Sequence, residues 1–87
     1  MPYYVYMIKT VGGNYSKSYV GYTNNIKNRI KKHNNNKGAK STKGYKWKLI
    51  YKKKFLIKKN AMSYEYKLKK DRKKRASIIK SINDKKI

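Results

Sequence analysis

Electrostatic charge limits what this chain can fold into more than any other feature of its sequence. The 87 residues include 26 lysines and arginines against 3 acidic residues, which gives a formal net charge of +23 at pH 7. A compact fold with this charge repels itself unless a polyanion neutralises it. The usual polyanion is a nucleic-acid backbone, and such binding weakens steeply with salt. We therefore expect a nucleic-acid partner, and we retain passive surface basicity and an anionic membrane surface as alternatives.

Aromatic content indicates that the chain nevertheless folds. Aromatic residues make up 14% of the sequence and include ten tyrosines, whereas disordered chains are poor in aromatics. The length suits one domain with a modest core, and we expect a single domain over residues 1–87. The chain has no cysteine and one histidine, which excludes a disulfide framework, a cysteine-ligated zinc site and a multi-histidine metal site.

Two features of the sequence predict where the protein resides. No apolar run approaches the roughly 20 residues that a membrane-spanning helix needs. The N-terminal stretch MPYYVYMIK does not have the basic and apolar regions of a signal peptide. We therefore expect an intracellular protein, in the cytoplasm, the nucleoid or the nucleus, that does not bind a membrane.

The N-terminal part of the chain predicts a β-hairpin followed by a helix. Residues 3–10 and 15–23 are rich in β-branched and aromatic side chains, and a Gly-Gly-Asn turn signal separates them. Residues 26–33 repeat at helical spacing after candidate N-caps at 23–25. The stretch 34–38 is rich in Asn and ends in Gly, which is suited to ending this helix.

The remaining sequence predicts a third strand and two helices. Residues 47–57 alternate apolar and lysine side chains, which is typical of a strand with one buried face. We expect the next helix to begin at Asn60 or Ser63 and the last at Asp71. The expected inward positions of the two helices are Ala61, Tyr64, Glu65 and Leu68, then Ala76, Ile79 and Ile82. The order β-β-α-β-α-α predicts an α+β fold, a small three-stranded antiparallel sheet flanked by helices.

Glu65 is the acidic residue that the pattern singles out, because it falls on the apolar face of a predicted helix. A buried carboxylate needs a cationic partner or a metal ion. An ion pair with a lysine is one explanation. The other is a Mg²⁺ site, because Mg²⁺ often takes only one or two protein carboxylates and adds water and substrate phosphate. One glutamate suits a one-metal site and cannot build a two-metal site.

Arg29, His33 and two tyrosines complete the candidate chemistry. Arg29 shares a helix face with His33, and its guanidinium could bind a phosphate or its stem could cover the core. His33 could exchange a proton near that phosphate or bond a helix-end carbonyl. Tyr6 and Tyr19 are either core aromatics or site phenols whose pKa neighbouring cations lower. Gly21 within a strand predicts the close approach of another group.

These residues, in this order, resemble the GIY-YIG nuclease domain over roughly residues 3–80. The first motif appears at residues 4–6 (YVY) and the second at 19–21 (YVG), and Arg29 and His33 follow. The sequence is most similar to the small stand-alone UPF0213 group and, through it, to Slx1-like structure-specific endonucleases. It departs from the motif at its first position, where tyrosine replaces glycine.

The resemblance implies a divalent-metal-dependent endonuclease that hydrolyses DNA phosphodiester bonds in repair, recombination or processing. The general base is then Tyr6, whose phenolate the surrounding cations favour, and Tyr19 is a second phenol of the site. Arg29 binds the scissile phosphate with His33 beside it. Glu65 is the ligand of Mg²⁺ or Mn²⁺. No small-molecule cofactor is implied.

Four lysines are candidate contacts to the nucleic-acid backbone: Lys27, Lys31, Lys40 and Lys43. RNA stays open as a substrate beside DNA, and no oligomeric state is predicted. The alternative to an enzyme is a basic nucleic-acid-binding protein that keeps this fold without catalysis. A polybasic protein on a membrane surface is the third hypothesis.

Overall fold

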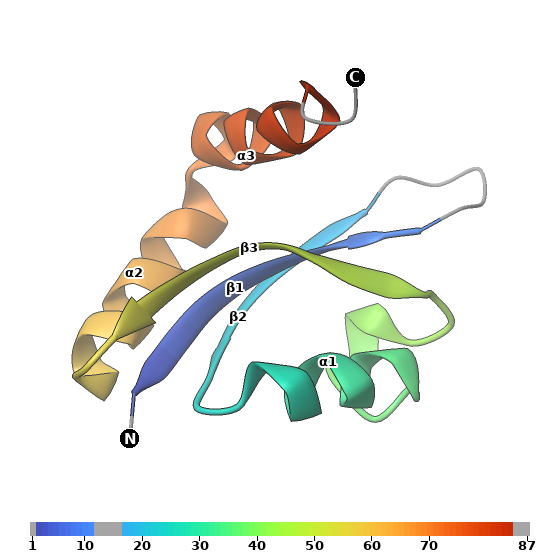
Figure 1. Cartoon of the computed structure of the whole chain (residues 1–87), viewed down its shortest axis with the longest axis horizontal. Coiled ribbons are helices and arrows are strands. Elements are labelled where there is room, and N and C mark those ends of the chain that lie inside the picture. Colours follow the sequence, from blue (N-terminus) through green and yellow to red (C-terminus); the bar gives the residue numbers. More distant parts are fainter. Residues whose placement is uncertain (1, 12–16, 85–87) are drawn as a thin grey trace.

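The computed structural model describes residues 2–11 and 17–84. These residues form three strands, three α-helices and a short 3₁₀ turn (Figure 1). The elements are β1 (Tyr3–Thr10), β2 (Ser18–Thr23), α1 (Ile26–Asn34), η1 (Lys40–Thr42), β3 (Trp47–Phe55), α2 (Lys58–Lys70) and α3 (Arg72–Asp84). The predicted α+β class and element order are confirmed. The predicted turn at 12–14 and positions 15–16 of the predicted second strand lie outside the described residues.

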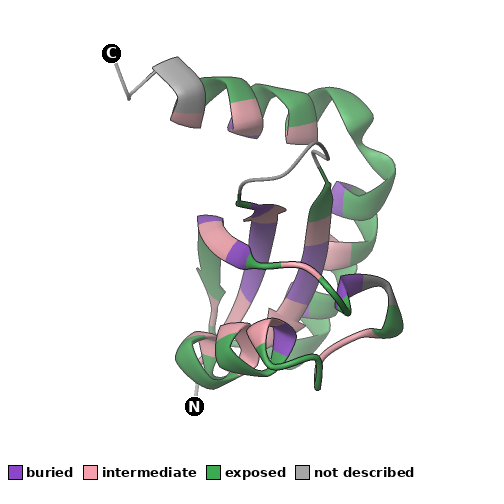
Figure 2. Ribbon diagram, turned by 90° about the vertical axis from the view of Figure 1, so that its right-hand side faces the viewer, coloured by how far each residue is buried: buried purple, intermediate pink, exposed green. Residues whose placement is uncertain are grey.

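β1 is the central strand of an antiparallel sheet with the order β2-β1-β3. Figure 1 shows α1 against one face of this sheet and α2 and α3 on the other side. Alternation along β1 sends Val5 and Met7 into the core on the α2–α3 side. Tyr6 and Ile8 enter a second cluster on the α1 side. All four side chains are fully buried, and Figure 2 shows the buried positions concentrated in the strands.

β3 differs from the prediction of one buried face. Met7 pairs with Tyr51, whereas the next residue of β1 pairs with Leu49, so Ile50 is an extra residue on β3. Such a bulge places two residues opposite one and resets the alternation of side chains. Trp47 and Leu49 therefore pack on the α1 side, and Ile50 and Tyr51 pack on the α2–α3 side. The two sides of the sheet share the apolar residues of this strand.

Polar side chains at the predicted positions determine the ends of two helices. The Asn25 side chain accepts a hydrogen bond from the Asn28 amide at 3.1 Å and caps α1. Asn36 follows the end of α1 with φ 62°, the left-handed conformation that Asn tolerates well. The Asp71 side chain accepts from the Lys74 amide at 2.9 Å, which confirms the predicted start of α3.

α2 begins earlier than predicted, at Lys58 rather than near Asn60 or Ser63. Its predicted inward residues Ala61 and Leu68 are buried. In α3 the predicted inward residue Ala76 is exposed, and Ile78 is buried in its place. A helix that starts at residue 72 turns Ile78, with Ile79 and Ile82 beside it, toward the sheet. None of the helices in the described part of the chain is long and apolar enough to cross a membrane.

Ile57 is the N-cap of α2 and makes no side-chain cap hydrogen bond. Its backbone is extended, with φ −116° and ψ 125°, and its side chain is 59% exposed. Isoleucine is among the poorest N-cap residues, because it offers no acceptor to the first amides of a helix. The N-terminus of α2 therefore contributes less to stability than the sequence could provide.

We expect Ile57→Asn to stabilise the protein, because the amide oxygen of Asn would accept a hydrogen bond from the first turn of α2. The expected gain is about 1 kcal/mol in the free energy of unfolding. In a domain of this size that gain corresponds to a rise of roughly 4–8 °C in Tm. Urea and thermal unfolding measure it. Leu56→Asn, one residue before the cap, is the control and should give no such gain.

Candidate active site

Tyr6 forms the centre of the site. Its side chain is fully buried on the α1 side of β1. The residue paired with it on β2 is Gly21, and a Cβ atom there would lie 2.5 Å from the Tyr6 hydroxyl oxygen. The predicted close approach at Gly21 is confirmed, since the tyrosine side chain lies over the neighbouring strand and needs a residue without a side chain.

α1 brings two predicted residues to the Tyr6 hydroxyl. Arg29 Nε donates a hydrogen bond to Tyr6 Oη at 3.3 Å, and His33 Nε2 lies 2.8 Å from the same oxygen. Arg29 and His33 are four residues apart and therefore lie on one face of the helix. The Tyr19 ring, from β2, has its centroid 5.0 Å from that of His33 and 6.4 Å from that of Tyr6. The structure thus brings together four of the five predicted site residues.

The partners of His33 determine which of its ring nitrogens carries a proton. Thr42 Oγ1 donates its hydrogen to the Ala39 carbonyl oxygen at 2.7 Å, so it accepts from His33 Nδ1, 3.0 Å away. Neutral His33 is therefore protonated on Nδ1, and its Nε2 is an acceptor. Tyr6 then donates its hydroxyl hydrogen to Nε2 while it accepts from Arg29. The hydrogen bonds run in one direction, from Arg29 through Tyr6 to His33.

Burial keeps both Tyr6 and His33 uncharged. Burial raises the pKa of Tyr6 to about 12, although the hydrogen bond and charge of Arg29 act in the opposite direction. Burial also lowers the pKa of His33, and the charge of Arg29 adds to this effect. Desolvation thus outweighs the adjacent guanidinium, and the expectation that cations together with a metal ion favour the Tyr6 phenolate stays a prediction. Tyr6 is a phenol at neutral pH and can act as a base only by passing its own proton to His33.

Glu65 belongs to α2 and has a side chain that is 16% exposed. Its Oε1 lies 3.3 Å from Lys69 Nζ, one turn further along the helix. The Lys69 ammonium in turn lies 5.7 Å from the centroid of the Tyr19 ring. After burial and Tyr19, the charge of Glu65 also raises the pKa of Tyr6. Glu65 is thus linked to the phenols by charge, and the ion pair that the sequence left as an alternative is present.

Comparisons with known proteins agree on one family. The GIY-YIG catalytic domain matches residues 2–85 of the chain. The chain belongs to the GIY-YIG family. It is 40% identical over 68 residues to the UPF0213 protein OB0043 of Oceanobacillus iheyensis, which covers 77% of this chain and 76% of that protein. It is 46% identical over 68 residues to the UPF0213 protein CPE1444 of Clostridium perfringens, which covers 77% and 70%.

A solved structure supports the same assignment. The solution NMR structure of the UPF0213 protein BH0048 from Bacillus halodurans matches with a TM-score of 0.52 and 34% identity, over 92% of this chain and 84% of that one. The predicted resemblance to the GIY-YIG domain and the UPF0213 group is confirmed. A GIY-YIG catalytic domain places the chain in a nuclease-type family.

The divalent ion that the GIY-YIG family implies needs oxygen ligands. Within residues 2–11 and 17–84, no group of three or more His, Cys, Asp or Glu side chains lies together. Glu65 can still serve, because Mg²⁺ accepts a single protein carboxylate with waters and a phosphate. Lys69 pairs with this carboxylate from an exposed position on the same helix, so a divalent ion would take the place of its ammonium. The residues fit a one-carboxylate site for Mg²⁺ or Mn²⁺.

The predicted backbone-binding lysines are all exposed near α1 and η1. Lys27 and Lys31 lie one turn apart on α1, Lys40 begins η1 and Lys43 follows it. This segment also carries Arg29, His33 and Thr42. Phosphates that reach the site would therefore meet lysines on both elements.

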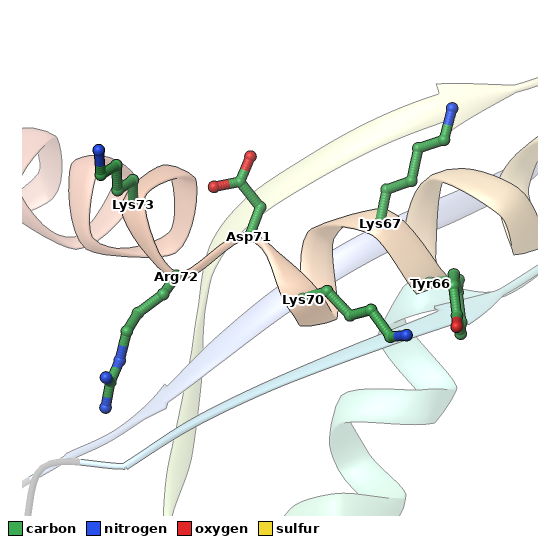
Figure 3. Close-up of a pocket in the computed structure, with 6 residues that line it drawn as sticks. All are labelled: Tyr66, Lys67, Lys70, Asp71, Arg72 and Lys73. Atoms are coloured by element: carbon green, nitrogen blue, oxygen red, sulfur yellow. The ribbon is translucent and has the colours of Figure 1, made fainter.

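A second basic surface lies at the elbow where α2 meets α3 (Figure 3). A surface cavity of about 460 Å³ is lined by Tyr66, Lys67, Lys70, Asp71, Arg72 and Lys73. Lys70 Nζ lies 4.4 Å from the centroid of the exposed Tyr66 ring. In Figure 3, Tyr66, Lys70 and Arg72 extend to the same side of the two helices. The sequence did not single out this elbow.

Three further residues of the site also escaped prediction. Thr42 is fully buried and orients His33. A side chain at Gly38 would clash with the His33 ring, so this glycine makes room for the histidine. Lys69 pairs with Glu65 and contacts Tyr19. The signal for the first two is the small-residue composition of residues 38–42, whereas no signal distinguishes Lys69 among so many lysines.

His33 makes stability depend on pH in a defined window. Its pKa in the folded protein is lowered below the ordinary value of 6.5. Above pH 6.5, His33 is neutral in both the folded and the unfolded chain, and its contribution to the free energy of unfolding is fully present. Below pH 6.5, His33 binds a proton in the unfolded chain but not in the folded chain. The free energy of unfolding therefore falls with pH until the pH reaches the pKa of His33 in the folded protein.

Urea unfolding between pH 8 and pH 5 measures this dependence. His33 is the only histidine of the chain, so few other groups titrate there. We expect His33→Gln to be less stable at pH 8 but to lose much less stability on acidification than the original protein. An equal loss in both proteins would show that His33 is not the titrating group.

Proposed function

We propose that the protein is a divalent-metal-dependent endonuclease that hydrolyses DNA phosphodiester bonds. The observation that carries this proposal is the one-directional hydrogen-bond chain from Arg29 through Tyr6 to His33 inside a GIY-YIG catalytic domain. A structural tyrosine needs one partner for its hydroxyl. Tyr6 instead has a cation on one side and a proton acceptor on the other, an arrangement that suits general-base chemistry next to a phosphate.

Proton transfer in this mechanism ends on His33. The attacking water gives a proton to Tyr6 Oη as Tyr6 gives its own proton to His33 Nε2, and the water oxygen bonds to phosphorus. Thr42 stabilises the imidazolium through the hydrogen bond from Nδ1. Tyr6 thus never has to exist as a free phenolate, which agrees with its pKa of about 12. The bond from phosphorus to the leaving oxygen breaks in the same displacement.

Charge on the phosphate is balanced from two sides. Arg29 uses Nε to bond Tyr6, and its terminal nitrogens are suited to bind the phosphate oxygens. A divalent ion at Glu65, when bound, would supply further charge neutralisation and stabilise the leaving oxygen. The exposed lysines contact the flanking backbone and do not read bases, so we expect selection by DNA structure rather than by sequence.

Glu65→Gln tests the metal role. It keeps the size of the side chain and removes the charge, so we expect Mg²⁺- and Mn²⁺-dependent nicking to fall by at least about 100-fold. DNA affinity should stay equal or increase, since a negative charge is lost. Gel-based cleavage of duplex, flap and branched DNA, and of an RNA duplex, measures the first effect, and fluorescence anisotropy measures the second.

Asp71→Asn is the matched control. It also removes one negative charge, but Asn keeps the cap of α3 that Asp71 provides. We expect its cleavage rate to equal that of the original protein. Metal-dependent nicking by Glu65→Gln at an undiminished rate would refute the role of Glu65.

Thr42→Val tests the positioning of His33. Valine has the shape of threonine but cannot accept the proton of Nδ1, so the preferred tautomer of His33 is lost. We expect kcat to fall roughly 10- to 100-fold, with DNA affinity unchanged and unfolding easier by about 1–3 kcal/mol. Thr42→Ser should restore most of kcat. If Thr42→Val changes stability alone, then the residue has only a structural role.

A non-catalytic nucleic-acid-binding protein is the second candidate. The ion pair of Glu65 with Lys69 favours it, because it satisfies the carboxylate without any metal. Salt-sensitive DNA binding by a pure protein that shows no nicking with Mg²⁺ or Mn²⁺ would establish this function instead.

A further inference from the structure

The turn between β3 and α2 presents an apolar tip, formed by Leu56 and Ile57. Leu56 is 79% exposed and Ile57 is 59% exposed. The two residues are adjacent in the chain, and Figure 1 shows the turn at one end of the sheet, where β3 passes into α2. Single apolar residues on a protein surface are ordinary. Two adjacent, exposed, large aliphatic side chains are unusual in a chain whose mean hydropathy is −1.09.

Stability does not explain the apolar tip. Leu56 is largely in contact with solvent and buries little surface. Ile57 occupies the N-cap of α2, where a polar residue would stabilise the helix. Ile57 thus costs stability in the folded protein, and Leu56 adds little to it. Positions where a residue contradicts the local preference and adds no stability are typical of functional positions.

Exposed lysines surround the apolar tip on both sides in the sequence. They are Lys52, Lys53 and Lys54 at the end of β3 and Lys58 and Lys59 at the start of α2. Lysines suit a phosphate backbone, and apolar side chains suit the gap between two bases. Proteins that kink or open DNA combine these two features, with Leu, Ile, Phe or Met as the wedge.

The apolar tip lies within reach of DNA that is bound at the active site. Phe55, the last residue of β3, pairs with Tyr3 of β1. Tyr6 lies three residues further along β1, which is about 10 Å at the rise of a strand. That span equals roughly three base steps of DNA. A bound DNA segment is therefore long enough to extend from the strand position of Tyr6 to the end of the sheet that carries the tip.

We propose that the apolar tip is a wedge that inserts between bases of the bound DNA, at a branch point or the end of a flap. Leu56 and Ile57 replace stacking at a step that is already weakened, and the flanking lysines hold the phosphates on either side. Intact duplex resists insertion, because every step must first be unstacked. This inference rests on the proposed function and deepens it, since it assigns the selection of DNA structure to two particular side chains.

An anionic membrane is the competing occupant. Interfacial membrane binding usually uses the whole apolar face of an amphipathic helix. Two adjacent side chains form the apolar tip, and lysines follow immediately at the start of α2. Met62 and Tyr66 are exposed further along this helix, among lysines, and do not extend the tip into a continuous apolar face. The observations therefore favour DNA, and vesicle binding is included as an outcome of the test.

The test measures base unstacking without cleavage. A flap DNA carries 2-aminopurine at the branch point, and its fluorescence is recorded at saturating protein without metal ion. We expect an increase of severalfold with the original protein. We expect at least half of that increase to be lost with Leu56→Ala and with Ile57→Asn. The ratio of flap to duplex cleavage in Mg²⁺ should fall in parallel.

Two features of the design separate a wedge from a folding defect. Ile57→Asn should raise Tm while it lowers the fluorescence signal, which a destabilised protein cannot do. Val11→Ala is the matched control, because Val11 is also exposed, at 52%, and follows the opposite end of β1. It should leave the signal unchanged.

The proposal is overturned if Leu56→Ala and Ile57→Asn give the full fluorescence increase of the original protein. If these variants also lose binding to vesicles with phosphatidylserine, the tip is assigned to a membrane. The fluorescence measurement requires no cleavage. If the protein binds DNA but does not nick it, the proposed function is refuted, while the fluorescence still tests whether the tip inserts between bases.

Discussion

The hydrogen bond from Tyr6 to His33 is the interaction on which the α1 side of the structure depends. It is buried, and it joins the central strand to the first helix. Each partner has a second bond, to Arg29 or to Thr42. No buried side-chain polar atom within the described residues lacks a partner. Since an unpaired buried group costs about 1–3 kcal/mol, the residues proposed for chemistry also hold the fold together.

The two sides of the sheet divide stability and chemistry between them. On the α2–α3 side, Val5 and Met7 meet Leu68 and Ile78 in an apolar core. On the α1 side, the same strand contributes a phenol to a polar network. A strand that is covered on both faces can serve both purposes, because alternate side chains point in opposite directions. Glu65 connects the two sides, because it extends from α2 and its charge acts on Tyr6.

Features that depend on neighbours in the sequence were predictable. Local pattern and residue size predict the strand at residues 3–10, the helix from Ile26, the cap at Asp71 and the close approach at Gly21. The faces of β3 were not predictable, because the bulge at Ile50 is defined by its pairing with another strand.

Features that depend on burial and on tertiary contacts could not be predicted from the sequence. The direction of the pKa shift at Tyr6 is one, since it follows from how completely the folded chain removes water from the hydroxyl. The partner of His33 is another. Thr42 lies nine residues away in a segment without apolar periodicity, and only the folded chain brings its hydroxyl to Nδ1. The four residues of the cluster were nevertheless identifiable, because two tyrosine motifs and a helix face constrain them jointly.

The net charge of +23 explains how the protein can expose an apolar tip. Exposed aliphatic side chains normally promote self-association, but two copies of this chain repel each other at any distance shorter than the screening length. A polyanion removes this repulsion because it neutralises the lysines around the tip. In the proposed complex, the same charge that opposes folding therefore keeps the tip from other copies of the chain and directs it to nucleic acid.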